Sequence, residues 1–176
     1  AAAVLFAAVG SILPDQYEIT RSIEIKAHPI KVYLHVGELR DWPKWWPWKE
    51  LESSAKFSFG AQTSGVGSTV SLKGRPGPGR VKITEASPTA GIAFDYSFDS
   101  GAGNGRGSIE FRVSETATIA PWRVRGRFAT PVLKGYLAAM ADSMHGGMLG
   151  GGLNNLKTLV EADAREIFGA EPLPQA

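Results

Sequence analysis

Seven segments of the sequence alternate between apolar and polar residues, and one long segment with helical periodicity follows them. The alternation is clearest in 91–99, where one face carries Ile92, Phe94, Tyr96 and Phe98. The alternating segments are 17–26, 55–59, 67–73, 80–86, 91–99, 107–113 and 116–128. Such alternation is typical of half-buried strands, and their unbroken succession predicts antiparallel pairing. A sheet with one apolar face needs a covering layer, which segment 136–168 can supply.

Two short helices are expected between the first and second strands. Pro29 is tolerated in the first turn of a helix, and the helix that it opens ends near Gly37. Asp41 suits the cap of a second helix, which Pro47 stops. The predicted class is therefore α+β: a seven-stranded curved antiparallel sheet wrapped around a long C-terminal helix, with two short helices after the first strand.

The long helical segment contains an unusual run of glycines. They are Gly146, Gly147, Gly150, Gly151 and Gly152. Each glycine costs about 0.8–1 kcal/mol against alanine in a helix interior, so we expect a kinked or mobile turn here. Either the segment opens as a gate, or bare backbone is needed for close packing against the sheet.

Composition limits the classes of function. Nineteen basic and 17 acidic residues are nearly balanced, so no nucleic-acid partner is predicted. The absence of cysteine excludes disulfides and thiolate sites, and we predict neither a metal nor a cofactor. Arg123, Arg125 and Arg127 alternate along the last strand, which favours ion pairs on a wet face over an anion site. Oligomeric state is left open.

The first thirteen residues, 1–13, contain no charged side chain. A membrane-spanning helix needs about 20 apolar residues and a secretory signal begins with a basic region, so the segment matches neither pattern alone. Because the chain opens on Ala1, we interpret it as the distal end of a membrane anchor, with a cleaved signal or a buried segment as alternatives. We expect a membrane-associated protein, with an extracytoplasmic domain as one option. Residues 14–168 are expected to form one domain, and 169–176 a disordered tail.

Several short motifs occur in an order that identifies a family. They are Arg21-Ser22-Ile23-Glu24-Ile25, then Ala27, Pro29 and Val32-Tyr33, then Trp42, Trp45 and Pro47-Trp48, then Gly65-Val66-Gly67, and finally Gly152-Leu153-Asn154-Asn155-Leu156-Lys157. In these features the chain resembles the polyketide cyclase/dehydrase branch of the SRPBCC superfamily, which includes START and birch-pollen-allergen-like proteins. The resemblance covers roughly 14–168. It implies the helix-grip fold, an internal hydrophobic cavity and, as in many bacterial members, a domain behind an N-terminal membrane segment.

The resemblance and the patterns together indicate the residues that line a cavity. Met140, Met144 and Met148 are spaced by four and form one stripe of the last helix, which is either ordinary core or pocket lining. The opposing wall is predicted to consist of Phe94, Tyr96, Phe98, Phe111 and Trp122. In the tryptophan cluster, Trp42 and Trp45 are expected to pack in the core. Trp46 and Trp48 are assigned to the ligand site at the cavity mouth, with a membrane-interface role as the alternative.

No catalytic constellation is visible in the sequence. His28, His35 and His145 have neither metal-ligand spacing nor a Ser–His–Asp order. The leading hypothesis is therefore a membrane-tethered protein that binds a lipid-like or polycyclic molecule. One alternative is a polyketide cyclase or dehydratase that uses Tyr96, Arg21 or His145 to handle protons. A second is a protein-interaction module that uses the outer face of the sheet.

Overall fold

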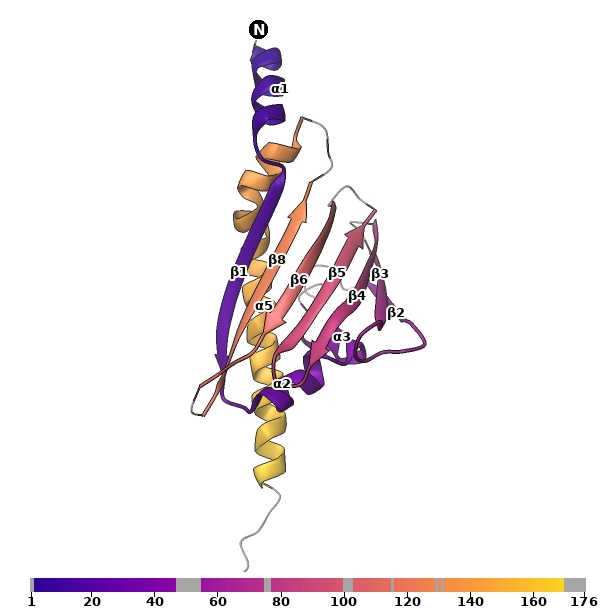
Figure 1. Ribbon diagram of the computed structural model, residues 1–176, viewed down its shortest axis with the longest axis vertical. Helices are drawn as coiled ribbons and strands as arrows, with labels where there is room; N and C mark the ends of the chain where they lie inside the picture. The colour runs from indigo at the N-terminus through magenta and orange to yellow at the C-terminus, as the bar shows by residue number, and fades with distance from the viewer. Residues whose placement is uncertain are drawn as a thin grey trace, which may run out of the picture.

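The alternating segments form one curved sheet, and the long C-terminal helix runs along its concave side (Figure 1). The computed structural model describes residues 2–46, 55–74, 77–99, 103–114, 116–128, 130 and 132–169. In chain order the elements are α1 (Ala2–Ile12), β1 (Gln16–Ile25), α2 (Pro29–Val36), the 3₁₀ helix η1 (Leu39–Asp41), α3 (Trp42–Trp45), β2 (Lys56–Phe59), β3 (Thr69–Gly74), β4 (Gly77–Ser87), β5 (Gly91–Phe98), β6 (Gly103–Glu110), β7 (Arg112–Val113), β8 (Thr118–Arg127) and α5 (Lys134–Gly169).

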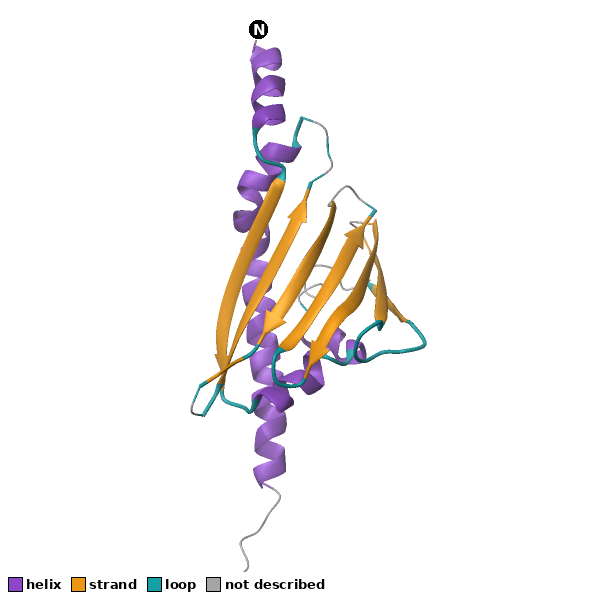
Figure 2. Ribbon diagram, viewed as in Figure 1, coloured by secondary structure: helices purple, strands orange, loops and turns teal. Residues whose placement is uncertain are grey.

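The described strands form a single eight-stranded antiparallel sheet. Its order is β1-β8-β6-β5-β4-β3-β2, and β7 also pairs with β8. Each strand from β2 to β6 pairs with its neighbour in sequence, whereas β1 closes onto β8. The helices α2, α3 and α5 lie on the same side of this sheet (Figure 2). The predicted helix-grip architecture, with two short helices after the first strand, is confirmed.

A proline in a strand usually marks an edge or a bulge, because it has no N–H to donate, but Pro121 is not in an edge strand. It lies in β8, in register with Ser22 of β1, and so occupies an interior strand. On the opposite side of β8 the pairing passes from Ile109 of β6 to Arg112 of β7. The ladder is interrupted between these two pairs, where the proline has no N–H to donate. The sheet tolerates the proline because its partner strand is broken at the same level.

The outer face of the sheet carries paired charges. Glu18 Oε1 lies 3.2 Å from Arg123 Nε, and Glu18 Oε2 lies 2.7 Å from Arg125 Nε. Arg127 Nε lies 3.4 Å from Asp15 Oδ1. The three alternating arginines therefore form ion pairs on a solvated face, as the sequence predicted.

His35 ties the short helices to α5. Its Nδ1 lies 2.9 Å from Asp41 Oδ2, and its Nε2 lies 3.1 Å from Asp163 Oδ2 on α5. The His35 carbonyl accepts a hydrogen bond of 3.2 Å from Trp45 Nε1, and the Val36 carbonyl accepts one of 2.9 Å from Trp42 Nε1. Both indoles are thus buried with a satisfied N–H, as expected for core residues.

The glycine-rich part of α5 is helical without interruption, so the predicted turn does not form, while opening of this segment as a gate stays a prediction. Leu149, Leu153 and Leu156 are each at most 2% exposed, and their burial against the sheet opposes the poor helix propensity of the glycines. A Cβ atom at Gly146 would lie 2.0 Å from Arg21 Nη2, whereas one at Gly147, Gly150 or Gly151 would have no atom within 4 Å. Close packing therefore explains Gly146 and not these other three glycines.

The N-terminal helix packs on the beginning of α5. Tyr136 Oη donates a hydrogen bond of 3.0 Å to the Phe6 carbonyl, and the two rings stack with centroids 4.5 Å apart. A Cβ atom at Gly10 would lie 2.1 Å from the Val132 carbonyl oxygen. The absence of a side chain at Gly10 therefore lets α1 approach the chain just before α5. Within the described residues, none of the helices combines the length and the apolar character that a membrane crossing requires.

Replacing Gly147 and Gly151 with alanine should stabilise the protein. Neither added methyl group meets another atom within 4 Å, and both positions are helical. Each substitution is expected to raise the free energy of unfolding by about 1 kcal/mol, measured by urea denaturation.

Gly146→Ala is the matched control, because its methyl group would displace the Arg21 guanidinium from its ion pair with Asp142. It should gain less than either of the other variants, or lose stability. A loss of stability in Gly147→Ala and Gly151→Ala would contradict a continuous helix. Hydrogen exchange at the same amides tests the gate, which requires exchange faster than at Leu156.

Candidate functional site

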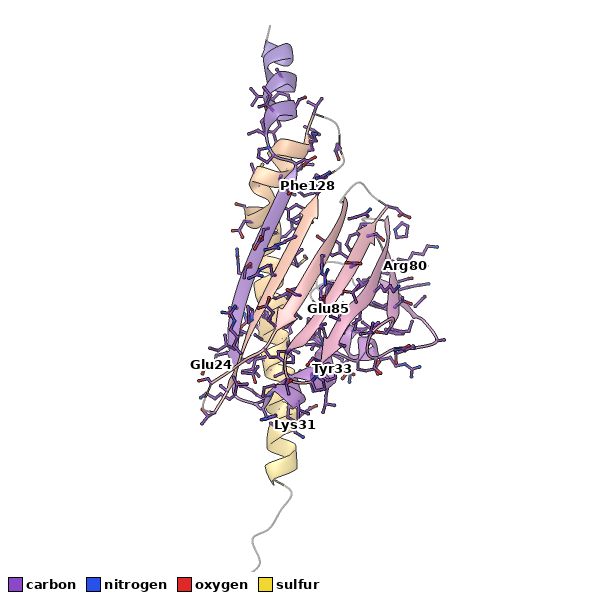
Figure 3. The ribbon with its side chains drawn as sticks, in the orientation of Figure 1. Glu24, Lys31, Tyr33, Arg80, Glu85 and Phe128 are labelled. Atoms are coloured by element: carbon purple, nitrogen blue, oxygen red, sulfur yellow. The ribbon has the colours of Figure 1, made fainter. Side chains whose placement is uncertain are left out.

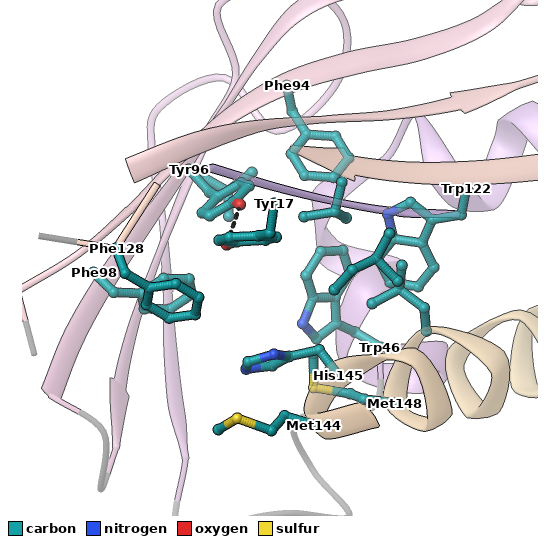
Figure 4. A pocket seen from close by; sticks show the side chains of 14 residues that line it. Tyr17, Trp46, Phe94, Tyr96, Phe98, Trp122, Phe128, Met144, His145 and Met148 are labelled. Carbon is teal, nitrogen blue, oxygen red and sulfur yellow. Dashed lines mark hydrogen bonds between the residues drawn. The ribbon is translucent and has the colours of Figure 1, made fainter. Parts of the chain in front are cut away.

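A cavity of about 330 Å³ lies between the concave face of the sheet and α5. This volume is within the range of small-molecule sites. The residues that line it are Tyr17, Ile19, Trp46, Val81, Phe94, Tyr96, Phe98, Trp122, Val124, Phe128, Met144, His145, Met148 and Leu149 (Figure 4). Among these described residues there is no Asp, Glu, Lys or Arg, so the site suits a ligand that is largely apolar and carries no net charge.

The concave face is hollow because aromatic rings from β5 lie over glycines of the neighbouring strands. A Cβ atom at Gly107 would lie 2.3 Å from the Phe94 ring, and one at Gly79 would lie 2.3 Å from the Phe98 ring. Larger residues at these positions would push the rings away from the sheet and toward α5. The missing side chains therefore leave room for the cavity.

One row of residues across four strands brings two tyrosines together. Tyr17 on β1 pairs with Gly126 on β8, Gly126 pairs with Gly105 on β6, and Gly105 pairs with Tyr96 on β5. Both phenol rings lean over the two glycines, and their hydroxyl oxygens meet 2.8 Å apart (Figure 4). A Cβ atom at Gly126 would lie 2.5 Å from Tyr17 Oη and 2.6 Å from Tyr96 Oη.

The tyrosine pair is the main polar feature of the sheet wall. Tyr96 Oη also donates a hydrogen bond of 3.2 Å to the Arg125 carbonyl. Burial raises the pKa of both Tyr17 and Tyr96 above the ordinary value of a phenol. Both hydroxyls therefore remain protonated at neutral pH. They are suited to hydrogen bonding, and poorly suited to act as bases.

The helix wall contributes Met144, His145, Met148 and Leu149. His145 Nδ1 lies 3.2 Å from the Ala141 carbonyl one turn earlier, and a carbonyl can only accept, so Nδ1 carries the proton. In the neutral ring this leaves Nε2 as an acceptor. Figure 4 shows His145 and the tyrosine pair on opposite sides of the cavity.

Most of the residues predicted to line a cavity do line it. Trp46, Phe94, Tyr96, Phe98, Trp122, Met144 and Met148 are all in its wall. That they bind a ligand stays a prediction. Trp46 is only 8% exposed and its ring centroid lies 4.9 Å from that of Trp122, so it belongs to the interior of the wall and not to the protein surface. Trp48 lies outside the described residues.

Two predicted lining residues lie elsewhere. Met140 is 56% exposed and does not reach the cavity. A spacing of four residues overshoots the helical turn by about 40° per step, so the stripe drifts from solvent at Met140 to the interior at Met148. Phe111 is buried just after the end of β6, beyond the cavity.

The sequence reasoning missed Tyr17 and Phe128 as site residues. Tyr17 opens the first predicted strand and Phe128 closes the last, but neither was connected with the other aromatic residues. Their ring centroids lie 4.9 Å apart. The pairing of β1 with β8 brings them together, and no local signal announces it.

The cavity lies toward the end of the sheet from which α1 extends. Tyr17 is the second residue of β1, Phe98 is the last of β5, and Phe128 follows β8. Because β1 runs antiparallel to β5 and β8, the start of β1 and the ends of β5 and β8 lie at the same end of the sheet. Figure 3 shows Phe128 near α1. Met144, from the first third of α5, is 52% exposed, which places it at the mouth.

Arg21, a candidate for proton handling, lies outside the cavity. Its Nη1 lies 2.8 Å from Asp142 Oδ1 on α5, and the hydrogen bond between them holds the pKa of Asp142 below its usual range. Arg21 therefore joins β1 to α5.

Within the described parts of the chain, no three His, Cys, Asp or Glu side chains form a metal-binding group.

Comparisons with known proteins agree with this geometry. Residues 16–161 match the profile of a family described as "Polyketide cyclase / dehydrase and lipid transport". A comparison with curated proteins gives no match.

Several solved structures share the fold. Norcoclaurine synthase from Thalictrum flavum, a point mutant in complex with a transition state analogue, superposes with a TM-score of 0.63 at 12% identity, covering 85% of this chain and 96% of that one. The di-domain ARO/CYC StfQ from the steffimycin biosynthetic pathway gives 0.62 at 12% identity, covering 85% of this chain and 52% of StfQ. Protein CV1439 from Chromobacterium violaceum gives 0.58 at 18% identity, with 82% and 96% covered. At these identities the likeness concerns the fold alone.

Gly126→Ala should disrupt the hydrogen bond between Tyr17 and Tyr96, because Gly126 lies beneath both hydroxyl groups. The added methyl group would lie 2.5 Å from Tyr17 Oη and 2.6 Å from Tyr96 Oη, so the hydroxyl pair must separate. We expect a loss of about 1–3 kcal/mol in the free energy of unfolding, measured by urea denaturation. Gly126→Ala in a Tyr17→Phe background should cost less, because one of the two oxygens is gone. Equal losses in both backgrounds would show that the methyl group is accommodated without disturbing the pair.

Proposed function

Because the chain belongs to the polyketide cyclase/dehydrase and lipid transport family, we propose that it binds a hydrophobic small molecule, lipid-like or polycyclic, in the cavity between its sheet and α5. The observation that carries the proposal is the composition of the cavity wall, which joins aromatic rings from the sheet to two methionines from the helix. Methionine side chains are unbranched and polarizable, so they adapt to apolar ligands of different shapes.

Binding is favoured over proton transfer by the chemistry of the polar groups. An acid or base works best with a pKa near the working pH, whereas burial moves the pKa of Tyr17 and Tyr96 away from it. His145 and the tyrosine pair stand on opposite walls, so they do not form an acid–base pair with each other (Figure 4). The cyclase or dehydratase alternative would need a catalytic role for a single group.

The outer face of the sheet offers less for the protein-interaction alternative. Its arginines are engaged by Glu18 and Asp15, so a partner would have to compete with existing ion pairs. The open cavity, in contrast, has no occupant from the described part of the chain. The unfilled space is what a ligand-binding role requires.

We also propose that the protein works at a membrane, with α1 as the point of attachment. Phe6, Val9 and Ile12 of α1 are 48%, 40% and 83% exposed, although the helix contains only apolar or small residues and one serine. The cavity lies toward the same end, and exposed Met144 stands at its mouth. Attachment through α1 would therefore bring the mouth close to the lipid from which an apolar ligand comes.

Met144→Glu should weaken binding strongly without unfolding the protein. Met144 lines the cavity and is 52% exposed, so a carboxylate there can stay hydrated while it opposes an apolar ligand. We expect the affinity for the neutral probe N-phenyl-1-naphthylamine to fall at least about tenfold, measured by fluorescence titration.

Met140→Glu is the matched control. Met140 lies one turn earlier on the same helix and is 56% exposed, but it does not line the cavity. Both variants should keep the free energy of unfolding within about 0.5 kcal/mol of the parent. Equal probe binding by the two variants would remove the cavity as the binding site.

Charging α1 should detach the protein from lipid. Val9→Asp with Ile12→Asp places two carboxylates on the exposed side of α1, and we expect binding to phosphatidylcholine vesicles to fall at least about tenfold in a flotation assay. The control is Ile30→Asp with Leu34→Asp on α2, where the side chains are 45% and 55% exposed at the opposite end of the molecule. If the control detaches the protein equally well, or if the parent does not float, the attachment through α1 is wrong.

A further inference from the structure

The direction of the hydrogen bond between Tyr17 and Tyr96 follows from counting the protons of the two hydroxyl groups. A phenol has one proton to donate and two lone pairs that can accept. Tyr96 Oη gives its proton to the Arg125 carbonyl at 3.2 Å, and that carbonyl can only accept. The 2.8 Å contact between the two hydroxyls must then use the proton of Tyr17. Tyr17 Oη is left with unused lone pairs and no proton.

His145, the polar group on the opposite wall of the cavity, also offers a hydrogen-bond acceptor. His145 Nδ1 donates to the Ala141 carbonyl, so the neutral ring offers Nε2 as an acceptor. The indole N–H groups of Trp46 and Trp122 are donors without a partner, but both nitrogens are buried inside the wall and are not exposed at its surface. Among the described lining residues, the cavity therefore presents hydrogen-bond acceptors to a ligand.

We propose that the site selects apolar molecules that carry a hydroxyl group, which donates its proton to Tyr17 Oη. This rests on the proposed binding function and names the class of ligand. An alcohol or phenol can satisfy Tyr17 and remain uncharged, as a cavity without Asp or Glu in its described wall requires. A ketone, ether or ester of the same skeleton offers only acceptors, and its oxygen would face the lone pairs of Tyr17 without a proton between them.

The arrangement is built into the sheet and is not an accident of two flexible side chains. Tyr17 and Tyr96 belong to strands separated by β8 and β6, and glycine occupies both intervening positions of the row. At Gly105 an added Cβ atom would lie 2.2 Å from Tyr96 Oη and 2.2 Å from the Arg125 carbonyl oxygen. The bare backbone thus permits the carbonyl contact that fixes the direction of the hydrogen bonds.

The test compares 9-fluorenol with 9-fluorenone, which share one tricyclic skeleton and differ in the hydroxyl group. Isothermal titration calorimetry on the full chain should give tighter binding of 9-fluorenol, on the order of 3- to 10-fold, the effect of one hydrogen bond. Tyr17→Phe should remove the preference while both compounds still bind. Tyr33→Phe makes the same chemical change on α2, away from the cavity, and should keep the preference of the parent (Figure 3).

Tyr96→Phe tests the direction itself. Without the Tyr96 oxygen, the proton of Tyr17 is free to turn toward the ligand, so 9-fluorenone should bind more tightly than it does to the parent. A loss of packing alone would weaken both compounds together. Thermal unfolding of each variant confirms that it is folded.

Each outcome bears on a different claim. Equal binding of the two compounds by the parent, or a preference for 9-fluorenone, would overturn hydroxyl selection. A hydroxyl preference that survives Tyr17→Phe would overturn Tyr17 as the acceptor. Each of these results would leave the binding function intact. Failure of both compounds and of N-phenyl-1-naphthylamine to bind the parent would overturn the binding function and, with it, this inference.

Discussion

The cavity exists because glycines lie under aromatic side chains on the concave face of the sheet. Phe94, Tyr96 and Phe98 rest over Gly107, Gly105 and Gly79 of the neighbouring strands. A ring that lies along the sheet covers the glycine backbone and fills little of the space above it. The same residues over larger neighbours would point toward α5 and fill the interior, as in an ordinary close-packed core.

The position of α5 is fixed at two levels, and the cavity lies toward one of them. At one level His35 of α2 pairs with Asp163 of α5, and α3 packs against the same helix. Near the mouth, Arg21 of β1 pairs with Asp142 and covers Gly146. Leu149, Leu153 and Leu156 pack between these levels, so the helix stays continuous through the glycines. The helical wall of the cavity is therefore held from both ends.

The architecture could be predicted because its signals are local. Alternation located the strands, prolines and caps located the short helices, and the period of the last segment located α5. The site was predicted less completely, because it depends on which strands meet. Tyr96 was assigned to the site from its place in a strand, but its partner Tyr17 lies 79 residues earlier and meets it only through the register of four strands. Met140 was misplaced for another reason: a stripe with a spacing of four drifts around the helix, and its first member reaches solvent.

The glycines beneath the rings have a consequence for how such a protein diversifies. Residues that touch a ligand are constrained by the molecules already bound, whereas Gly79, Gly105 and Gly107 lie behind the wall. A substitution at one of them would tilt the ring above it and reshape the binding surface without altering any contacting residue. New specificities could therefore arise in evolution, or be selected in a library, from positions that a survey of ligand contacts would pass over.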